Sequence, residues 1–424
     1  MFRRSIVIAF LIAVLTASAR GQEAQPRFFI ERIEVRNTHR VSTDVVIAES
    51  LLHENQEYSE NDLRDAANRL SRLPFLLSVD FALEKGSERG RHVLVLTVNE
   101  TRPLFYRLDL VQYFENSPRL LLEYSDDRGQ IDGESLAVGA RWFVGRRGVV
   151  HGGLTSSSSD GEFSRDYAAL AVGYTQYDLF GTRAFATLNL KKPIEGYGEG
   201  LLSPEVVVGV PLSVNQTLTL QYDETRFATE HNTILGEDYE ERFGQRRVQA
   251  TWAFNTTNDP FLPTSGTLLQ LSPSHGWADG VSTIVSFGPD EEVEVRTPAY
   301  HVSFLELRGS ATRYFERGES DSFWANVQGE WARAHIVQTA FDAEYDRDAH
   351  RMSAGIGYSH SLWSRERRVS GDSRIELTAR YTQHSDNEDP RGFIGDSKDV
   401  RQLAAAWVRR SSWGTLRLGA GYAW

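Results

Sequence analysis

The C-terminal stretch Gly414-Thr-Leu-Arg-Leu-Gly-Ala-Gly-Tyr-Ala-Trp424 alternates between two kinds of side chain. Every second residue is apolar or aromatic, and most of the residues between them are small or polar. Successive side chains of an extended strand point to opposite faces. The stretch therefore predicts a β-strand with one continuous apolar face, formed by Leu416, Leu418, Ala420, Tyr422 and Trp424.

The same period of two continues upstream to about residue 104. Representative apolar rows run from Leu136 to Val144, from Val248 to Phe254 and from Ile375 to Tyr381, each opposite a row that contains arginine. Segments of about ten residues have the length that a tilted strand needs to cross a membrane. A soluble β-sandwich would need more apolar residues on its inner faces, so the pattern favours a barrel that turns its apolar face to lipid.

The composition agrees with such a barrel. The 424 residues include 58 acidic and 46 basic side chains, so the net charge of −12 argues against a nucleic-acid partner. With 40% hydrophobic residues in total, a bundle of transmembrane helices is excluded. The absence of cysteine excludes disulfides, thiolate metal sites and cysteine nucleophiles.

We therefore predict an all-β transmembrane barrel of about sixteen antiparallel strands over residues 104–424. Its strands are expected to start near residues 104, 117, 134, 147, 166, 182, 201, 214, 243, 264, 300, 320, 350, 373, 399 and 413. The stretch from Ser282 to Phe287 could be a further strand.

Residues 1–19 have the three-part pattern of a secretory signal peptide. Arg3 and Arg4 precede an apolar run that is too short to cross a bilayer, and Ala17-Ser-Ala19 follows it. We expect cleavage after Ala19 and export to the envelope of a Gram-negative bacterium.

A small α/β unit is predicted over residues 28–101. Alternation around Ile33 and Val35 indicates a first strand, and two short helices follow, the second opening at Ser59. The runs from Leu77 to Leu83 and from Val93 to Val98 indicate a β-hairpin. We expect this unit to lie in the periplasm.

This order of elements resembles that of a POTRA domain. The resemblance rests on Ile33-Glu-Val35, on the stretch from Leu70 to Val79, and on Val98-Asn-Glu100. Arg36-Asn37 and Glu57 depart from glycines that are usual in that domain.

The C-terminal strand also resembles the assembly signal of outer-membrane barrels, with Arg417, Gly419, Tyr422 and Trp424 at the matching positions. Together with a single POTRA-like unit, the barrel is similar to the outer-membrane assembly-factor superfamily, which includes BamA, TamA and the two-partner-secretion transporters. Residues 177–182 resemble the superfamily's Asn-Leu-Phe-Gly turn, and residues 258–266 resemble its Phe-Pro-Thr-x-Gly turn. Arg391, Gly392 and Phe393 have the letters of its lumenal lid motif, but they stand closer to the C-terminus than expected and on a connection expected to face the periplasm.

The resemblance implies a protein that helps to insert or translocate other proteins at the outer membrane. Unfolded outer-membrane or secreted clients would dock on the edge of the POTRA-like sheet, at Val93, Val95 and Thr97, and a barrel seam would template them. The implied partners are outer-membrane lipid, these clients, and the assembly machinery that reads the C-terminal strand. A secretion transporter and a porin are the alternatives. We expect no catalytic residues, cofactor or metal, because no nucleophile motif and no histidine pair with metal-ligand spacing occurs in the sequence.

Overall fold

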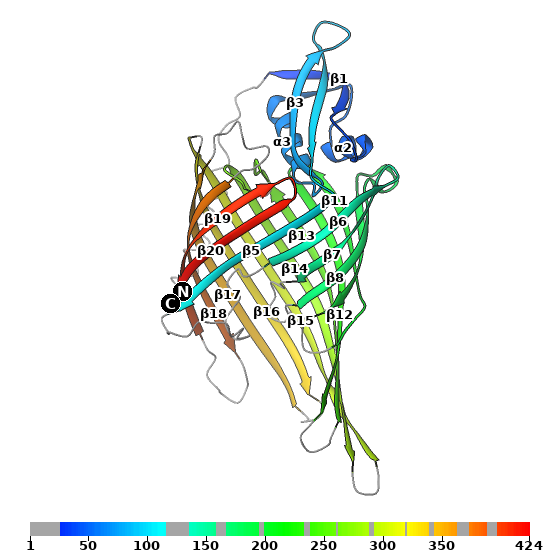
Figure 1. The fold of residues 1–424 in the computed structure, drawn as a ribbon, viewed down its shortest axis with the longest axis vertical. Helices are drawn as coiled ribbons and strands as arrows, with labels where there is room; N and C mark the ends of the chain where they lie inside the picture. The colour runs from blue at the N-terminus through cyan, green and yellow to red at the C-terminus, as the bar shows by residue number, and fades with distance from the viewer. Residues whose placement is uncertain are drawn as a thin grey trace.

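The computed structural model describes residues 26–115, 135–157, 167–194, 199–232, 238–259, 262–287, 292–318, 320–338, 343–362, 373–387 and 397–424. The predicted signal peptide at 1–19 and the possible lid motif at 391–393 lie outside these residues. The described chain has two parts, a small α/β domain and a large barrel, with the domain seated at one end of the barrel (Figure 1). We call this the domain end, and the opposite one the far end.

The small domain has a four-stranded sheet in the order β2-β1-β4-β3. Its elements are β1 (Arg27–Arg36), α2 (Thr43–Ser50), β2 (Gln56–Ser59), α3 (Glu60–Ser71), β3 (Leu76–Lys85) and β4 (Arg91–Glu100). β1 and β4 are parallel, and the other pairs are antiparallel. The short strand β2 was not expected from the sequence.

Helix α3 forms where the sequence predicted its start. Ser59 and Asp62 form a reciprocal capping box, which satisfies backbone N–H groups at the helix start. The predicted apolar stripe, including Leu63, Ala66 and Leu70, is buried against the sheet in one hydrophobic core.

The barrel strands are β5 (Leu104–Glu115), β6 (Ser135–Val144), β7 (Gly148–Ser157), β8 (Tyr167–Gln176), β9 (Phe185–Pro193), β10 (Glu199–Leu201), β11 (Ser203–Ser213), β12 (Gln216–Asn232), β13 (Asp238–Asn255), β14 (Gly266–Phe287), β15 (Glu292–Arg317), β16 (Asp321–Gln338), β17 (Ala343–Ser361), β18 (Ser373–Asn387), β19 (Ser397–Ser411) and β20 (Gly414–Ala423). β10 and β11 pair with successive parts of β12 and are separated by Leu202 alone, so they form one interrupted strand. The described barrel therefore has fifteen strands. Ser282 to Phe287 continue β14 and form no separate strand.

The barrel closes by parallel pairing of β20 with β5, over ten registered residue pairs from Gly414↔Tyr106 to Ala423↔Glu115. Fifteen is an odd number, so the first and last strands of the meander run in the same direction. The all-antiparallel closure expected for about sixteen strands is therefore replaced by one parallel pair. The strand expected to start near residue 117 lies outside the described residues, and β5 pairs directly with β6.

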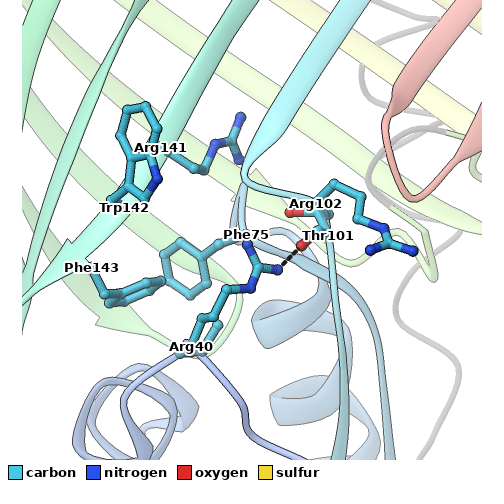
Figure 2. Close-up of a pocket in the computed structure, with 8 residues that line it drawn as sticks. Arg40, Phe75, Thr101, Arg102, Arg141, Trp142 and Phe143 are labelled. Carbon is cyan, nitrogen blue, oxygen red and sulfur yellow. Dashed lines mark hydrogen bonds between the residues drawn. The ribbon is translucent and has the colours of Figure 1, made fainter.

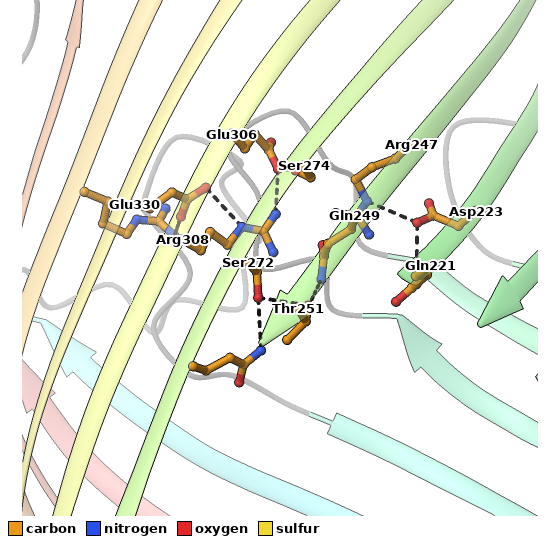
Figure 3. A network of polar contacts seen from close by, with 12 residues as sticks. Gln221, Asp223, Arg247, Gln249, Thr251, Ser272, Ser274, Glu306, Arg308 and Glu330 are labelled. Carbon is orange, nitrogen blue, oxygen red and sulfur yellow. Dashed lines mark hydrogen bonds and ion pairs between the residues drawn. The ribbon is translucent and has the colours of Figure 1, made fainter. Parts of the chain in front are cut away.

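The two faces of the barrel strands separate as the alternation predicted. The outward rows are apolar and exposed, as at Leu170 and Val172 on β8 and at Ile375 and Leu377 on β18. The inward rows are polar, and a network of them crosses β12 to β16 (Figure 3). In that network Asp223 accepts a hydrogen bond from Arg247 at 3.1 Å, and Glu306 accepts one from Arg308 at 2.9 Å. The outer face is therefore suited to lipid, and the inner face is held by ion pairs and hydrogen bonds.

No helix in the described ranges is long and apolar enough to cross a membrane.

Candidate functional site at the mouth and seam of the barrel

The small domain contacts the turns that connect the barrel strands at the domain end. Asn215, in the turn between β11 and β12, donates to Asp65 of α3 at 2.8 Å. Arg72, just after α3, donates to the carbonyl oxygen of Thr257 at 3.1 Å, between β13 and β14. Arg183, between β8 and β9, donates to the carbonyl oxygen of Leu52. The domain is thus attached to three separate turns and lies across the mouth of the barrel.

An aromatic contact anchors the domain to the barrel. The ring of Phe75, only 3% exposed, meets Phe143 edge-on at a centroid distance of 4.9 Å and Tyr177 at 5.6 Å. Burial raises the pKa of the Tyr177 phenol far above its ordinary value, so this group stays neutral. Burial, helped by the charge of Arg69, lowers the pKa of Arg72 to about 10. Burial at the junction therefore shifts the pKa of both Tyr177 and Arg72 toward the uncharged form.

Residues 177–182 form the first of the two predicted turn motifs, and they lie at this junction. Asp178 pairs with Arg147 of the neighbouring turn at 2.9 Å and accepts a hydrogen bond from the backbone N–H of Arg183. Phe180 adopts a positive φ of 53° and is 97% exposed. A positive φ is unusual for an aromatic residue, so this turn is held by the contacts on either side of it.

The second predicted turn motif, residues 258–266, lies between β13 and β14 at the domain end, and its described residues are 258, 259 and 262–266. The side chain of Asn258 accepts hydrogen bonds from the backbone N–H groups of Thr264 and Ser265, which closes the turn on itself. Asp259 pairs with Arg410 of β19 at 2.6 Å. The turn joins β13 to β14, and five strands separate β13 from β19 around the barrel. The ion pair therefore bridges distant parts of the rim, and Arg410 also donates to the carbonyl oxygen of Leu77 in the domain.

The seam between β5 and β20 begins at the same end. The linker from the domain to β5 is tied to the turn between β19 and β20, because the backbone N–H of Arg102 donates to the carbonyl oxygen of Ser412 at 2.7 Å. The backbone N–H of Tyr106 then donates to the carbonyl oxygen of Trp413 at 2.9 Å. A movement of the domain would therefore act directly on the start of the seam.

The predicted docking residues Val93, Val95 and Thr97 do not lie at a sheet edge. They belong to β4, which pairs with β1 on one side and with β3 on the other. The expected edge placement is wrong. The chain crosses over and places β4 parallel to β1, so β4 lies inside the sheet and β3 lies at its edge. The open edges of the described sheet belong to β3 and to the short β2.

The C-terminal residues of the predicted assembly signal occupy both faces of β20. Tyr422 and Trp424 are exposed on the outer face with their ring centroids 5.7 Å apart. Arg417 faces inward and lies 3.5 Å from Glu376 of β18, and Gly419 packs closely against Ala405 and Ala406 of β19. This arrangement agrees with the predicted alternation, but it does not test recognition by an assembly machinery.

The possible lid residues Arg391, Gly392 and Phe393 lie outside the described residues, but the strands that flank them are described. β18 ends and β19 begins at the far end of the barrel (Figure 1). The expectation that this connection lies on the same side as the small domain is therefore wrong. With fifteen strands, β18 and β19 are the thirteenth and fourteenth strands of the barrel. In the count of sixteen they were the fourteenth and fifteenth, which put their connection at the opposite end.

Sequence reasoning missed the junction between the domain and the barrel. Phe75 lies in the POTRA-like stretch and Phe143 in a predicted strand, and local patterns do not predict their contact because it joins residues 68 positions apart. Across the part of the chain that is described, no group of three or more His, Asp and Glu residues is placed to hold a metal ion.

Comparison with known proteins gives remote structural similarity only. No protein-family model matches the chain, and no curated protein matches its sequence. BamA from Haemophilus ducreyi lacking POTRA domains 1–3 is 8% identical, with 95% of this chain and 86% of that chain covered and a TM-score of 0.27. CdiB from Escherichia coli is 11% identical, with 96% and 89% covered and a TM-score of 0.39. CdiB from Acinetobacter baumannii is 10% identical, with 91% and 68% covered and a TM-score of 0.41. The fold described above stands on the strand pairing of this chain itself.

Proposed function

We propose that this chain is an outer-membrane barrel that assists the insertion or translocation of other proteins, with its small domain in the periplasm. The observation that carries the proposal is the attachment of the domain to the start of the seam, through the linker that ends at Pro103. The protein performs no bond chemistry in this proposal. Its work is to offer backbone hydrogen bonds to a client that has not yet folded.

The edge of β3 beyond Val79 supports client binding, whereas at the start of β3 the Leu77 carbonyl oxygen accepts from Arg410 and the Val79 N–H donates to Ser71. An edge strand presents unpaired N–H and C=O groups, and an extended peptide can add to it as a further strand. β3 is ten residues long, and its side chains at Asp80, Ala82 and Glu84 are exposed. The docking edge is thus proposed on β3, in place of the residues on β4.

The parallel seam supports a second step. Parallel pairing is slightly weaker per residue than antiparallel pairing, so the barrel opens in this proposal at the ten pairs between β5 and β20. A client hairpin could pair with the freed edges, since a backbone polar group cannot stay unpaired in lipid.

The covered mouth disfavours the porin alternative. The small domain lies over the domain end, and the ion pair of Asp259 with Arg410 links the turn after β13 to β19 across the rim. A passive pore has no use for such a cover. A transporter that secretes one partner protein is compatible with the same domain, turn and seam. The transporter and the assembly factor differ in whether one secreted protein or many outer-membrane proteins are affected when the seam is locked.

The test is to lock the seam in a chain that contains no native cysteine. Leu108 and Leu416 face each other in register across the seam, so Leu108→Cys with Leu416→Cys should crosslink them. Ala379→Cys with Leu403→Cys, which pair between β18 and β19, is the matched control. In cells that depend on this gene, oxidation of the seam pair should reduce the level of folded outer-membrane proteins, and reduction should restore it. The control pair should have no effect.

A second measurement tests client docking. A photo-crosslinking residue at Ala82 on β3 should capture unfolded outer-membrane proteins, whereas the same residue at Arg64 on the exposed side of α3 should not. Unchanged protein assembly with the seam locked, together with equal capture at both positions, would refute the proposal. Loss of one secreted protein alone, with normal assembly of others, would replace it with the transporter function.

A further inference from the structure

Two hollows at the domain end of the barrel differ in how their side chains are arranged. In the hollow beside the small domain, Arg141 and Trp142 are successive residues of β6 and point to opposite sides of the wall (Figure 2). The side chains of that hollow therefore do not converge. The other hollow, of about 400 Å³, lies where β15 ends and β16 begins, and it is lined by Arg317, Asp321, Phe323 and Tyr358.

The four side chains that line this second hollow share the outward face of the barrel wall. Directly opposed residues of paired strands lie on the same face, and the register opposes Arg317 to Asp321 and Phe323 to Tyr358. Phe315, two residues before Arg317 on β15, opposes Phe323 and is 51% exposed among the outward apolar residues. A guanidinium, a carboxylate and aromatic rings therefore meet on the side of the wall that faces lipid.

The order of the outward residues places this hollow at the boundary of the membrane. Toward the domain end, the outward row of β17 passes from Ile356, which is 63% exposed, to Tyr358 and then to His360. The row of β16 ends in the same way, with Phe323 followed by Asp321. Aromatic residues of membrane barrels form girdles at the interfaces between hydrocarbon and water. The aromatic part of the hollow therefore lies at the top of the acyl chains, and its charged part lies among the headgroups.

Both charged groups of the hollow have capacity for a ligand. Asp321 accepts hydrogen bonds at Oδ1 from the Tyr358 hydroxyl at 2.6 Å and from His360 at 2.8 Å. Within the described ranges its Oδ2 accepts none. Arg317 is exposed, and no carboxylate among the residues that the structure describes lies at ion-pair distance from it. Arg313, the preceding arginine on the same row, already donates to Thr267. A positioned carboxylate oxygen and an unpaired guanidinium thus border one opening.

We propose that this hollow binds a zwitterionic phospholipid whose headgroup carries an ammonium, such as phosphatidylethanolamine, from the leaflet on the domain side. The Arg317 guanidinium holds the phosphate oxygens, and Oδ2 of Asp321 accepts from the ammonium. The upper acyl chains lie on Phe315, Phe323 and Tyr358, where the last two rings are 5.1 Å apart.

The pairing of one cation with one carboxylate sets the selectivity of this site. An anionic headgroup without an ammonium places its negative charge beside Asp321 and offers that carboxylate no donor, so it binds more weakly. The proposal requires only that the barrel spans a membrane, and it is independent of the proposed function.

The test is native mass spectrometry of the whole protein released from nanodiscs that contain equal amounts of phosphatidylethanolamine and phosphatidylglycerol. The wild type should retain phosphatidylethanolamine in about tenfold excess over phosphatidylglycerol. Arg317→Gln should lower the retention of both lipids about tenfold, since a hydrogen bond between charged groups is lost. Arg146→Gln is the matched control, because it removes the same charge at the same end from a side chain that is 88% exposed on the turn after β6.

A second variant, Asp321→Asn, tests the selectivity. The amide keeps an oxygen that can accept from Tyr358 and His360, but it removes the negative charge that attracts the ammonium. The two lipids should then be retained about equally. Heat-modifiable gel migration checks that each variant is folded, and the preference of the wild type needs no variant at all.

Three outcomes would overturn the proposal. Equal lipid retention by Arg317→Gln and Arg146→Gln would place the lipid elsewhere. Equal retention of the two lipids by the wild type would show that Asp321 does not bind the ammonium. Full displacement of the lipid by millimolar phosphoethanolamine would indicate a site for the free headgroup, to which the aromatic row contributes nothing.

Discussion

At the scale of single residues, Gly414 decides how closely the seam can pack. It begins β20 directly beside Tyr106 of β5, and a Cβ atom there would overlap the carbonyl oxygen of Tyr106. Glycine is the residue that permits such a close approach between backbones. The start of the seam therefore depends on the absence of one side chain.

We expect Gly414→Ala to weaken the seam, because the overlap must move the two backbones apart, at a cost of about 1–3 kcal/mol. The midpoint temperature at which the folded, fast-migrating gel band is lost should fall. Gly329→Ala on β16 is the control, since a Cβ atom there would meet nothing within 4 Å. An equal midpoint for the two variants would contradict this account of the seam.

Glu100, at the end of β4, makes the small domain sensitive to acid. Its carboxylate accepts hydrogen bonds from the backbone N–H groups of His39, Arg40 and Val41. Burial alone would raise the pKa of Glu100, but these donors and the charge of Arg40 lower it. A lowered pKa in the folded state stabilises the domain above the ordinary carboxyl pKa of about 4.3, and this stability is lost as the pH falls through the folded value.

We therefore expect hydrogen exchange of the amides of His39, Arg40 and Val41 to accelerate, beyond the intrinsic pH effect, below a pH of about 4.3. Glu100→Gln should give the fast exchange already at pH 7, with a loss of about 1.5–3 kcal/mol. Glu60→Gln, in an exposed pair with Arg64, should leave these amides unchanged. Protection that is the same in wild type and Glu100→Gln would show that the carboxylate does not hold this loop.

At the scale of elements, local patterns predicted most of the strands and helices, but they did not predict which strands pair with each other in the sheets. The capping box at Ser59 and the alternation on β8 and β18 are properties of a few adjacent residues, so the sequence displays them directly. The position of β4 in the sheet depends on the parallel crossover from β1, which the period of two does not encode. Val93-Leu-Val-Leu96 is an unbroken apolar run, which is typical of a strand covered on both faces. That run was the available signal for a central strand.

The turn between β13 and β14, which contains Asp259, is the element that we expect to control the open area of the mouth. Asp259→Asn removes the carboxylate charge that holds this turn to Arg410 across the rim. The turn should then leave the mouth more often, and conductance through planar bilayers should rise. Asp44→Asn is the control. Asp44 lies at the same end, and its carboxylate makes only a long, exposed pair with Arg146, at 4.0 Å. Identical conductance in the two variants would mean that the turn does not limit the pathway.

At the scale of the whole molecule, the domain and the barrel behave as one unit only while their junction holds. The hydrogen bonds from Arg72, Arg183 and Asn215 to partners across the junction are spread around the mouth. The aromatic contact of Phe75 provides the apolar part of the attachment. The barrel, in contrast, closes its own hydrogen bonds through β5 and β20. Damage at the junction should therefore release the domain and leave the barrel intact.

Phe75→Ala tests this division. Removing a buried phenylalanine costs about 3–5 kcal/mol, and here the loss falls on the contact with Phe143 and Tyr177. We expect proteinase K to remove the domain about tenfold faster or more, while the barrel keeps its heat-modifiable migration, because none of its strand pairs involves Phe75. Phe180→Ala is the control, since that ring is 97% exposed and contributes little packing. If Phe75→Ala also abolished the folded barrel band, the domain would be required for the barrel to close, and the seam would have to be regarded as stabilised by the domain above it.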